Sequence, residues 1–331
     1  MKIVLVCFVT LGAVFSSLAS ASEDLFRYKG KTYTVKDLDT KYWFRFFDLE
    51  LDVYRGKKNL LEDAFLEIYF KEMAAKKKQS VGQVRHELLG LAAPTEAELK
   101  KFYEENKNKI PYPYEKVKPE LKKFVERKNE QDKKQVLLKK LQEKNEWQVF
   151  LKEPKAPKVT IDTTGFARRG KNNAKVTVVE FADYKCPHCK EASLSFKKIY
   201  KKFESDVNFV FIDFPIISDV SYRIAEAAYC AGKQGKYWEF HMMGFDNQAT
   251  LQKDSPGMFA DKLALNRGIF DKCLVDKETI KFVKRSKAEG EKIGVAGTPA
   301  VYINGSKHTK GFSVDELEQA ISAALGGKTS G

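Results

Sequence analysis

The sequence predicts two domains: a mainly α-helical amino-terminal domain and an α/β carboxy-terminal domain in which strands alternate with helices. Three observations indicate this division. With 331 residues, the chain is long enough for two separate cores. Residues 152–158, Lys-Glu-Pro-Lys-Ala-Pro-Lys, combine two prolines with charge and are typical of an extended linker. Apolar residues follow helical spacing before this linker, over residues 22–151, and strand–helix alternation after it, over residues 159–327.

The first 21 residues have the pattern of a cleaved export signal. Lys2 precedes an apolar run over residues 3–14, and a stretch of small residues ends in Ala-Ser-Ala at 19–21. We expect cleavage after this stretch. An uncleaved membrane anchor is the alternative, because the apolar run is nearly long enough to span a bilayer. Cleavage would remove Cys7 and leave four cysteines in an exported protein, where disulfides persist.

The composition is that of a globular protein, with 43% hydrophobic and 31% charged residues. The formal net charge of +14 is compatible with binding to nucleic acid. However, the lysines lie among acidic residues in helical runs, and an exported protein meets little nucleic acid. We therefore predict no nucleic-acid partner, and we interpret the charge as a solvated surface that attracts anionic surfaces or acidic client proteins.

The amino-terminal domain is predicted to contain at least three helices. Apolar residues recur close to helical spacing over residues 61–73, and Thr95 with Glu98 forms a capping box that begins a second helix. A third helix is expected to begin with its proline at 119 and to cover residues 119–143. Its middle, residues 126–135, is polar on every face. We therefore expect this helix to bridge between two packed ends or to meet a partner.

The carboxy-terminal domain is predicted to open with a strand, a helix and a second strand. Residues 176–182 and 207–212 have the apolar pattern of buried strands, and a helix should begin just after Cys186. Further helices are expected at 220–231, 237–245, 278–292 and 314–324, with a late strand at 300–303.

A Cys-Pro-His-Cys motif lies between the predicted strand and the predicted helix, the context in which two cysteines at this spacing act as a redox pair. At a helix N-terminus, free N–H groups and the helix dipole favour a thiolate, and a protonated histidine would add a positive charge. Zinc binding is the alternative, but it needs two further ligands at a close spacing. The candidate residues are Cys186, Pro187, His188 and Cys189.

Residues 181–189, Phe-Ala-Asp-Tyr-Lys-Cys-Pro-His-Cys, resemble the active-site stretch of DsbA-like thiol-disulfide oxidoreductases. Residues 225–231, 235–241 and 294–300 match the same family, and the resemblance covers about residues 160–326. It implies an α/β thioredoxin-like fold with a helical insertion, and disulfide exchange through a mixed disulfide with the client. It implies no organic cofactor and no metal.

The resemblance also implies roles for single residues. Cys186 would join the client and Cys189 would resolve the mixed disulfide. Thr298-Pro299 would be a cis peptide bond beside the cysteines that binds the client, where an ordinary trans turn is the alternative. Glu180 would be a buried acid that exchanges a proton with Cys189, where a surface glutamate at a strand end is the alternative.

Cys230 and Cys273 flank the predicted helical insertion. A structural disulfide between them, which some relatives possess, is the simplest interpretation, and two buried free thiols are the alternative. His86, His241 and His308 show no pairing with an acid or a cysteine at a catalytic spacing. We interpret these histidines as structural or surface residues.

The amino-terminal domain resembles the chaperone segment of SurA-like periplasmic proteins. The resemblance rests on Tyr-Lys-Gly-Lys-Thr-Tyr-Thr at 28–34, on the helix over residues 60–78, and on residues 94–106. It implies peptide binding or self-association, and therefore a possible homo-oligomer.

The sequence as a whole predicts a periplasmic oxidoreductase that forms disulfides in exported proteins and is recycled by a membrane redox partner. The first alternative is a disulfide isomerase that uses the amino-terminal domain to bind clients or to oligomerise. The second, from another class, is a client-binding chaperone with secondary thiol chemistry.

Overall fold

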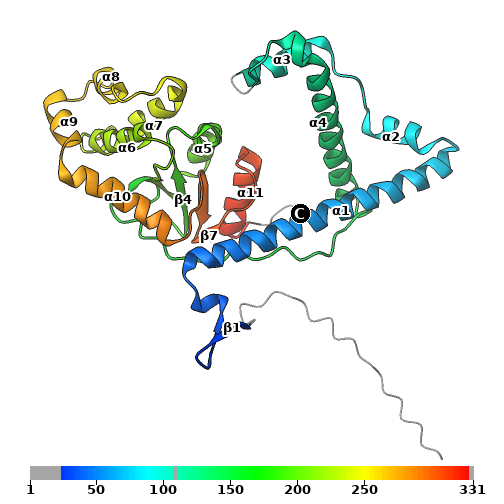
Figure 1. The fold of residues 1–331 in the computed structure, drawn as a ribbon, viewed down its shortest axis with the longest axis horizontal. Helices are drawn as coiled ribbons and strands as arrows, with labels where there is room; N and C mark the ends of the chain where they lie inside the picture. The colour runs from blue at the N-terminus through cyan, green and yellow to red at the C-terminus, as the bar shows by residue number, and fades with distance from the viewer. Residues whose placement is uncertain (1–23, 108–109, 328–331) are drawn as a thin grey trace, which may run out of the picture. The chain divides into compact units, whose positions relative to one another are not determined.

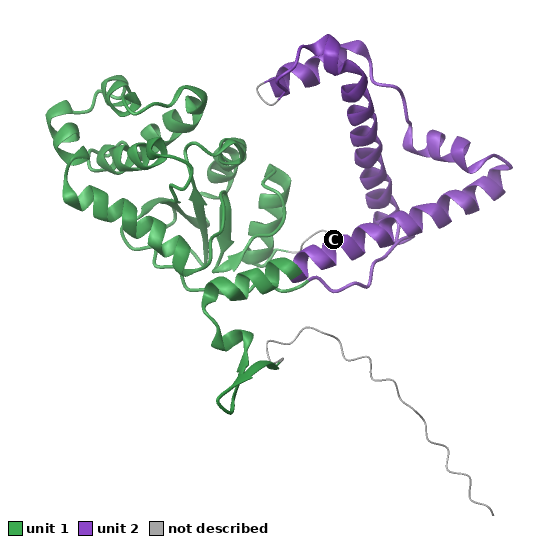
Figure 2. Cartoon of the chain, viewed as in Figure 1, with its two compact units in different colours: residues 1–49, 154–330 green, residues 50–153, 331 purple. Residues whose placement is uncertain are grey.

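The computed structural model describes residues 24–107 and 110–327. The described chain divides into two compact units, of which unit 1 contains residues 24–49 and 154–327 and unit 2 contains the described residues between 50 and 153 (Figure 2). Unit 1 holds an α/β domain, and unit 2 is helical, so the predicted fold class is confirmed.

The boundary between the units falls inside the linker predicted at residues 152–158. Residues 24–49, however, belong to unit 1, whereas the sequence places them in the amino-terminal domain. The expected export signal, residues 1–21, lies outside the described part of the chain. Among the residues that are described, no helix combines the length and the apolar character needed to cross a lipid bilayer.

A five-stranded sheet forms the centre of unit 1 (Figure 1). Its central pair, β4 and β5, is parallel, as the predicted strand–helix–strand unit requires, and the other pairs are antiparallel. β4 is buried along nearly its whole length because its apolar residues point alternately to two covered faces. β3 and β7 are short and rich in charge, which is why the apolar pattern does not predict them. In spatial order the strands are β3 (Ala167–Gly170), β5 (Val207–Asp213), β4 (Val176–Ala182), β6 (Ala300–Ile303) and β7 (Ser306–Lys307).

Helices cover both faces of this sheet. On one face, Phe196 of α5 and Leu317 of α11 pack with residues of β4 and β5. On the other face α10 lies so close that a Cβ on Gly290 would be 2.5 Å from the ring of Phe214. The helices between β5 and α10 are the predicted insertion, and their core is continuous with residues of the active-site turn, including Tyr184, Cys186 and Cys189. The helices of unit 1 after α1 are α5 (Pro187–Phe203), α6 (Asp219–Gly232), α7 (Tyr237–Asp246), α8 (Ser255–Lys262), α9 (Arg267–Leu274), α10 (Lys277–Lys292) and α11 (Val314–Leu325).

The first turns of α1 (Thr40–Lys77) are part of unit 1. Phe44 is 1% exposed, and its ring packs edge-on against Tyr302 of β6 with 5.9 Å between the ring centroids. Gly294, at φ 78°, approaches the backbone of α1 so closely that a Cβ there would lie 3.0 Å away. These contacts explain why residues 24–49 belong to the α/β unit. The segment before α1 contains β1 (Asp24–Tyr28), β2 (Lys31–Thr34) and the short helix η1 (Val35–Asp37).

Unit 2 contains the rest of α1 with α2 (Val81–Leu89), α3 (Glu96–Asn106) and α4 (Tyr114–Glu143). The predicted capping box of Thr95 and Glu98 is confirmed at the start of α3. The prediction that the next helix begins at Pro119 is wrong: α4 begins at Tyr114 and contains Pro119. Pro113, which is not helical, takes the position before the first turn instead.

Two small cores lie at the two ends of α4. Leu121 and Val125 pack against α3 at one end, and Leu138 packs against α1 and α2 at the other. The polar middle of α4 makes charged and polar contacts, including Glu130 with Arg85 of α2. Of the two roles expected for this helix, bridging between packed ends or meeting a partner, the first is therefore confirmed.

Candidate active site

The turn that follows β4 places Cys186 at the N-cap of α5 and Pro187 in its first turn. The Cys186 amide donates to the carbonyl of Asp183 at 3.0 Å. The Cys186 carbonyl accepts from the amides of Cys189 and Lys190 at 3.1 and 3.2 Å, which begins the helix. Both thiols are free; Cys186 is 5% exposed and Cys189 is fully buried. The first sulfur therefore lies at the helix N-terminus with limited access to solvent.

The carboxylate of Asp183 holds this turn in place through hydrogen bonds from backbone amides. It accepts from the amide of Lys185 at 2.7 Å and from the amides of Ile216 and Ile217, in the loop after β5, at 2.8 and 3.0 Å. The side chain is 1% exposed, and these backbone donors satisfy its charge. Asp183 was not among the predicted site residues, although an aspartate directly after a buried strand is a recognisable turn signal.

The two cysteines differ strongly in acidity. A hydrogen bond from Cys189 is the main reason why the pKa of Cys186 falls to about 5, and contacts with Thr298 and the amides of Cys189 and His188 add to it, while burial opposes it. For Cys189, burial is the main cause and raises the pKa far above its usual value. At pH 7 the pair therefore consists of a Cys186 thiolate and a Cys189 thiol, the arrangement of one nucleophile and one proton-holding partner.

His188 does not contribute through its ring. Its side chain is 72% exposed, and Nδ1 lies 3.4 Å from Oε2 of the equally exposed Glu191. Only its backbone N–H helps to lower the pKa of Cys186. The ring that the sequence places beside the thiolate thus lies next to a carboxylate on the outer face of α5.

The peptide bond between Thr298 and Pro299 is cis and lies beside the cysteines. The Cys186 Sγ is 3.2 Å from the Thr298 carbonyl oxygen. The two residues line one wall of a cavity of about 500 Å³ next to the motif. The other lining residues are His188, Glu191, Ala192, Ser195, Phe312 and Ser313.

Glu180 lies within β4, paired with Val301 of β6 and Phe211 of β5, and is 3% exposed. Its Oε2 accepts from the hydroxyl of Tyr200 of α5 at 3.3 Å, while Oε1 has no hydrogen-bond partner among the described residues. Burial raises the pKa of Glu180 to about 8. The residue is thus a buried acid under the helix that carries Cys189.

A second buried acid, Asp213 at the end of β5, was not predicted. Burial raises its pKa to about 8, and it accepts from the hydroxyl of Tyr237 at 3.3 Å. Tyr237 also bonds Tyr184 of the active-site turn, whose hydroxyl lies 3.2 Å from Nδ1 of His241. Burial lowers the pKa of His241 to about 3, so this histidine is neutral in the core. A lone aspartate in an apolar strand was the sequence signal for this network.

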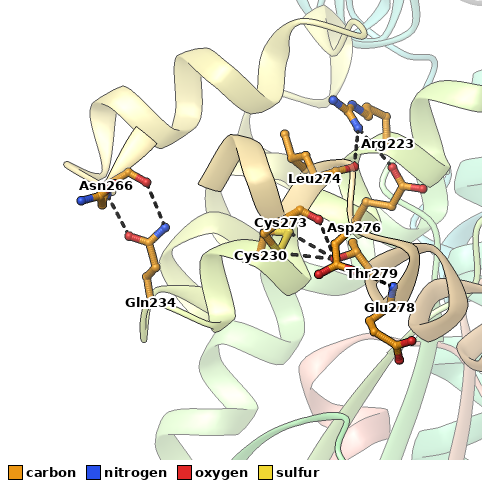
Figure 3. Close-up of a disulfide and its surroundings, with 10 residues drawn as sticks. Arg223, Cys230, Gln234, Asn266, Cys273, Leu274, Asp276, Glu278 and Thr279 are labelled. Atoms are coloured by element: carbon orange, nitrogen blue, oxygen red, sulfur yellow. Dashed lines mark hydrogen bonds and ion pairs between the residues drawn. A yellow bond between two sulfur atoms is a disulfide. The ribbon is translucent and has the colours of Figure 1, made fainter. Parts of the chain in front are cut away.

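Cys230 of α6 and Cys273 of α9 form a disulfide with an S–S distance of 2.01 Å (Figure 3). The hydroxyl of Thr279 lies 3.7 and 3.4 Å from the two sulfurs. Arg223 donates to the carbonyl of Leu274 at 3.1 Å, in the same region. The bond joins the two ends of the helical insertion. Within the described residues, no cluster of three or more His, Cys, Asp and Glu side chains could hold a metal ion.

Comparisons with known proteins fit this geometry. A family model described as Thioredoxin matches residues 162–323. The disulfide bond formation protein D of Bacillus subtilis is 34% identical over 171 residues, which are 48% of this chain and 77% of that protein. The chain belongs to this thioredoxin-like family. The resemblance found for the carboxy-terminal half is therefore confirmed.

Two further relatives differ in how much they share. A Na⁺/H⁺ antiporter NhaA 1 of Salinispora arenicola is 29% identical over 161 residues, and the chain spans only 24% of its length. The crystal structure of oxidised BdbD from Bacillus subtilis has a TM-score of 0.48 and 30% identity, covering 52% of this chain and 100% of that one.

Replacing the buried acid should remove a pH dependence of stability. Because the folded-state pKa of Glu180, about 8, is above the ordinary 4.5, the folded protein keeps a proton that the unfolded chain loses. The stability that this proton contributes is fully present below about pH 4.5 and is lost as the pH rises through 8. Glu180→Gln should therefore make the fall in unfolding free energy between pH 5 and pH 8, measured with urea, smaller than in the wild type, while Asp213, whose pKa burial also raises to about 8, keeps part of the fall.

The exposed Glu191→Gln is the matched control, and its pH profile of stability should stay that of the wild type. If Glu180→Gln and the wild type lose stability in parallel from pH 5 to pH 8, Glu180 is ionised in the folded protein, and its proposed proton exchange with Cys189 is excluded.

Proposed function

We propose that this protein is a thiol-disulfide oxidoreductase that forms disulfides in exported client proteins. The observation that carries the proposal is the asymmetric cysteine pair: a thiol at a helix N-terminus with its pKa lowered to about 5, beside a buried thiol whose pKa is raised. A stabilised thiolate favours the reduced form of the pair, so the disulfide form is a strong oxidant. The family membership and the similarity to a disulfide bond formation protein D support the same chemistry.

The reaction moves two electrons from the client to the enzyme pair. Of the two protons that the client dithiol loses, one is taken up at Cys189 through Glu180 and the other goes to solvent, because Cys186 is released as a thiolate. A client thiolate attacks Cys186 of the Cys186–Cys189 disulfide, forms a mixed disulfide and releases Cys189 as a thiolate. Cys189 takes up a proton, for which protonated Glu180 is the donor in our proposal. A second client thiolate then attacks the client sulfur of the mixed disulfide, which releases Cys186 as the low-pKa leaving group. The client is oxidised to its disulfide, and the enzyme pair is reduced to the thiolate and thiol that the two pKa shifts favour.

Client binding is proposed at the cavity beside the motif. Thr298 and Pro299 lie next to the Cys186 sulfur, and the backbone at Thr298 offers polar groups that an extended client segment could pair with. Phe312 and Pro299 add apolar surface to the same cavity. The clients are partly folded exported proteins, and a membrane redox partner would reoxidise the pair. The location we propose is the periplasm, reached through cleavage of the signal at residues 1–21.

A second candidate function is disulfide isomerisation, with unit 2 as a client-holding or self-associating module. Exposed apolar side chains on its α1 favour this candidate: Leu60 is 71% exposed and Ile68 is 58% exposed. The SurA-like resemblance of the amino-terminal region points the same way. A chaperone with secondary thiol chemistry is the third possibility and predicts client binding without a need for the cysteines.

Two ribonuclease substrates distinguish these functions. The oxidised protein should restore activity to reduced ribonuclease, whereas a direct assay on scrambled ribonuclease reports isomerisation. If unit 2 holds clients, Leu60→Lys combined with Ile68→Lys should lower activity on scrambled ribonuclease and leave oxidation of a small dithiol peptide unchanged. Equal activities of this variant and the wild type on both substrates would remove the client-holding role.

Surface substitutions are the right test, because the chain cannot simply be cut in the linker. A fragment that begins at Pro154 would lack Phe44, whose ring covers Tyr302, so unit 1 itself would be damaged. If the wild-type protein binds unfolded chains but does not oxidise reduced ribonuclease at all, its function is that of a chaperone and the proposed oxidoreductase function is wrong.

A further inference from the structure

A glutamine side chain of the helical insertion holds the backbone of the active-site turn. Gln248 begins the short helix η3 (Gln248–Thr250) after α7, and it is 8% exposed. Its Nε2 donates to the carbonyl of Tyr184 at 2.9 Å and to the carbonyl of Cys186 at 2.8 Å. Both hydrogens of the amide are therefore used on the two carbonyls that flank the reactive region of the turn.

The active-site turn also contacts the insertion through its own side chains. Lys185, between the two bonded residues, reaches back with Nζ 3.4 Å from the Gln248 carbonyl. The ring of Tyr184 packs against Phe245 of α7 with 4.8 Å between centroids, and Gly244 leaves room for it, since a Cβ there would lie 2.9 Å from that ring. The turn that carries Cys186 is thus docked on the helical insertion by its backbone and by a side chain.

We propose that Gln248 is a positioning residue for the thiol-disulfide exchange, holding the turn at Cys186 and stabilising its thiolate by binding the two neighbouring carbonyl oxygens. This inference rests on the proposed function. Carbonyl oxygens carry partial negative charge, and in a buried site an uncompensated oxygen disfavours a nearby anion. With the amide donors present, that charge is compensated and the carbonyl dipoles are fixed. The insertion therefore takes part in setting the redox equilibrium of a pair that lies on other elements.

The effect on the redox pair has a definite sign. Without the two donors, the Tyr184 carbonyl loses its bond from Gln248 and the Cys186 carbonyl keeps only the amides of Cys189 and Lys190. The less compensated carbonyl dipoles of the turn then disfavour the thiolate, so the pKa of Cys186 rises. The reduced form then loses part of its stabilisation, and the disulfide becomes easier to keep oxidised. One hydrogen bond is commonly worth about a tenfold change in an equilibrium constant. For a two-electron couple, a tenfold change corresponds to about 30 mV.

Gln248→Met tests the proposal, because methionine has nearly the same length but no donors. We expect the pKa of Cys186, followed by thiolate absorbance, to rise by about one unit. The equilibrium constant for reduction of the Cys186–Cys189 disulfide by glutathione should fall by about tenfold. Gln248→Glu, which keeps the shape and replaces the donor atom by an oxygen, should raise the pKa of Cys186 further.

Gln234→Met is the matched control within the same insertion. Gln234 also makes two amide hydrogen bonds, donating to the carbonyl of Asn266 at 3.3 Å and accepting from its amide at 2.8 Å, away from the active-site turn (Figure 3). Its loss should lower the melting temperature and leave both the pKa of Cys186 and the glutathione equilibrium unchanged. This separates positioning from a general loss of stability.

The outcomes are distinct. If Gln248→Met and Gln248→Glu fold and keep the wild-type pKa and glutathione equilibrium, the proposal is overturned. An equal change in the Gln234→Met control overturns it as well, since the effect is then one of insertion stability. If Gln248→Met does not fold, the isosteric Gln248→Glu decides alone. Failure of the wild type to exchange with glutathione would instead refute the proposed function, and the pKa measurement would still test the role of Gln248.

Discussion

Replacement of Cys186 by serine is expected to abolish disulfide exchange, whereas replacement of Cys189 by serine should trap the mixed disulfide with the client. Cys186 is the low-pKa thiol and therefore the leaving group and nucleophile, while a buried Cys189 acts only on the sulfur next to it. The Cys186 thiolate of the Cys189→Ser protein should attack a disulfide of scrambled ribonuclease and form a covalent adduct that disappears with reductant on a gel.

The rate of alkylation at different pH values measures the low pKa assigned to Cys186. With a pKa of about 5, half of Cys186 is ionised at pH 5. A thiol with an ordinary pKa near 8.5 would be less than about a thousandth ionised there. Iodoacetamide at pH 5 should therefore modify Cys186 first in the reduced wild type, with a rate that levels off just above this pH.

The Cys189→Ser protein is a check on the cause, because the hydrogen bond from Cys189 is the main contribution to the low pKa of Cys186. A serine hydroxyl can still donate, so the midpoint should shift only modestly, whereas Cys189→Ala should move it clearly upward. Faster labelling of Cys189 than of Cys186 in the wild type would reverse the two roles.

The sequence predicts the elements whose signal is local. β4 has a continuous apolar run, and Thr95 with Glu98 has a capping pattern that needs only three residues of context. The same local reasoning fails at Pro119, where a proline that suits a first helical turn lies inside α4. The competing N-terminus at Pro113 is set by the packing of Tyr114 and Val117 against α3, which no local pattern shows.

The residues of the candidate site likewise fall into those that a local motif predicts and those that only the tertiary fold brings together. Cys186 and Cys189 follow from a motif, because their spacing and their place after a strand are both visible in the sequence. Gln248 lies about sixty residues from the carbonyls that it binds, and the domain boundary shifts because Phe44 packs on Tyr302 across an even longer separation. Such long-range contacts depend on the tertiary fold, and a single sequence carries no periodicity that reports them.

Removing the disulfide of the insertion is expected to be the largest single loss of stability. The bond closes a loop with a sequence separation of 43 residues. In the chain-entropy description a loop of this size stabilises the folded state by about 4 kcal/mol. Cys230→Ala combined with Cys273→Ala should therefore lower the melting temperature of unit 1 by roughly 10 °C.

Active-site exchange should survive in this variant at temperatures where the insertion stays folded, because Cys186 and Cys189 lie on β4–α5 and not on α6 or α9. Cys230 is fully buried, so the alanine variant loses stability through a cavity as well as through the missing cross-link. Cys230→Ser with Cys273→Ser measures the cross-link with less change in volume.

In graded reductant, the Cys186–Cys189 disulfide should open first and the Cys230–Cys273 disulfide later, because a stabilised thiolate makes the active-site bond the more easily reduced of the two. Mass spectrometry of alkylated fragments measures this order. Wild-type protein in strong reductant should then unfold at the same urea concentration as the serine variant. A serine variant as stable as the oxidised wild type would mean that the bond joins segments already held together by packing, with no stabilisation of its own.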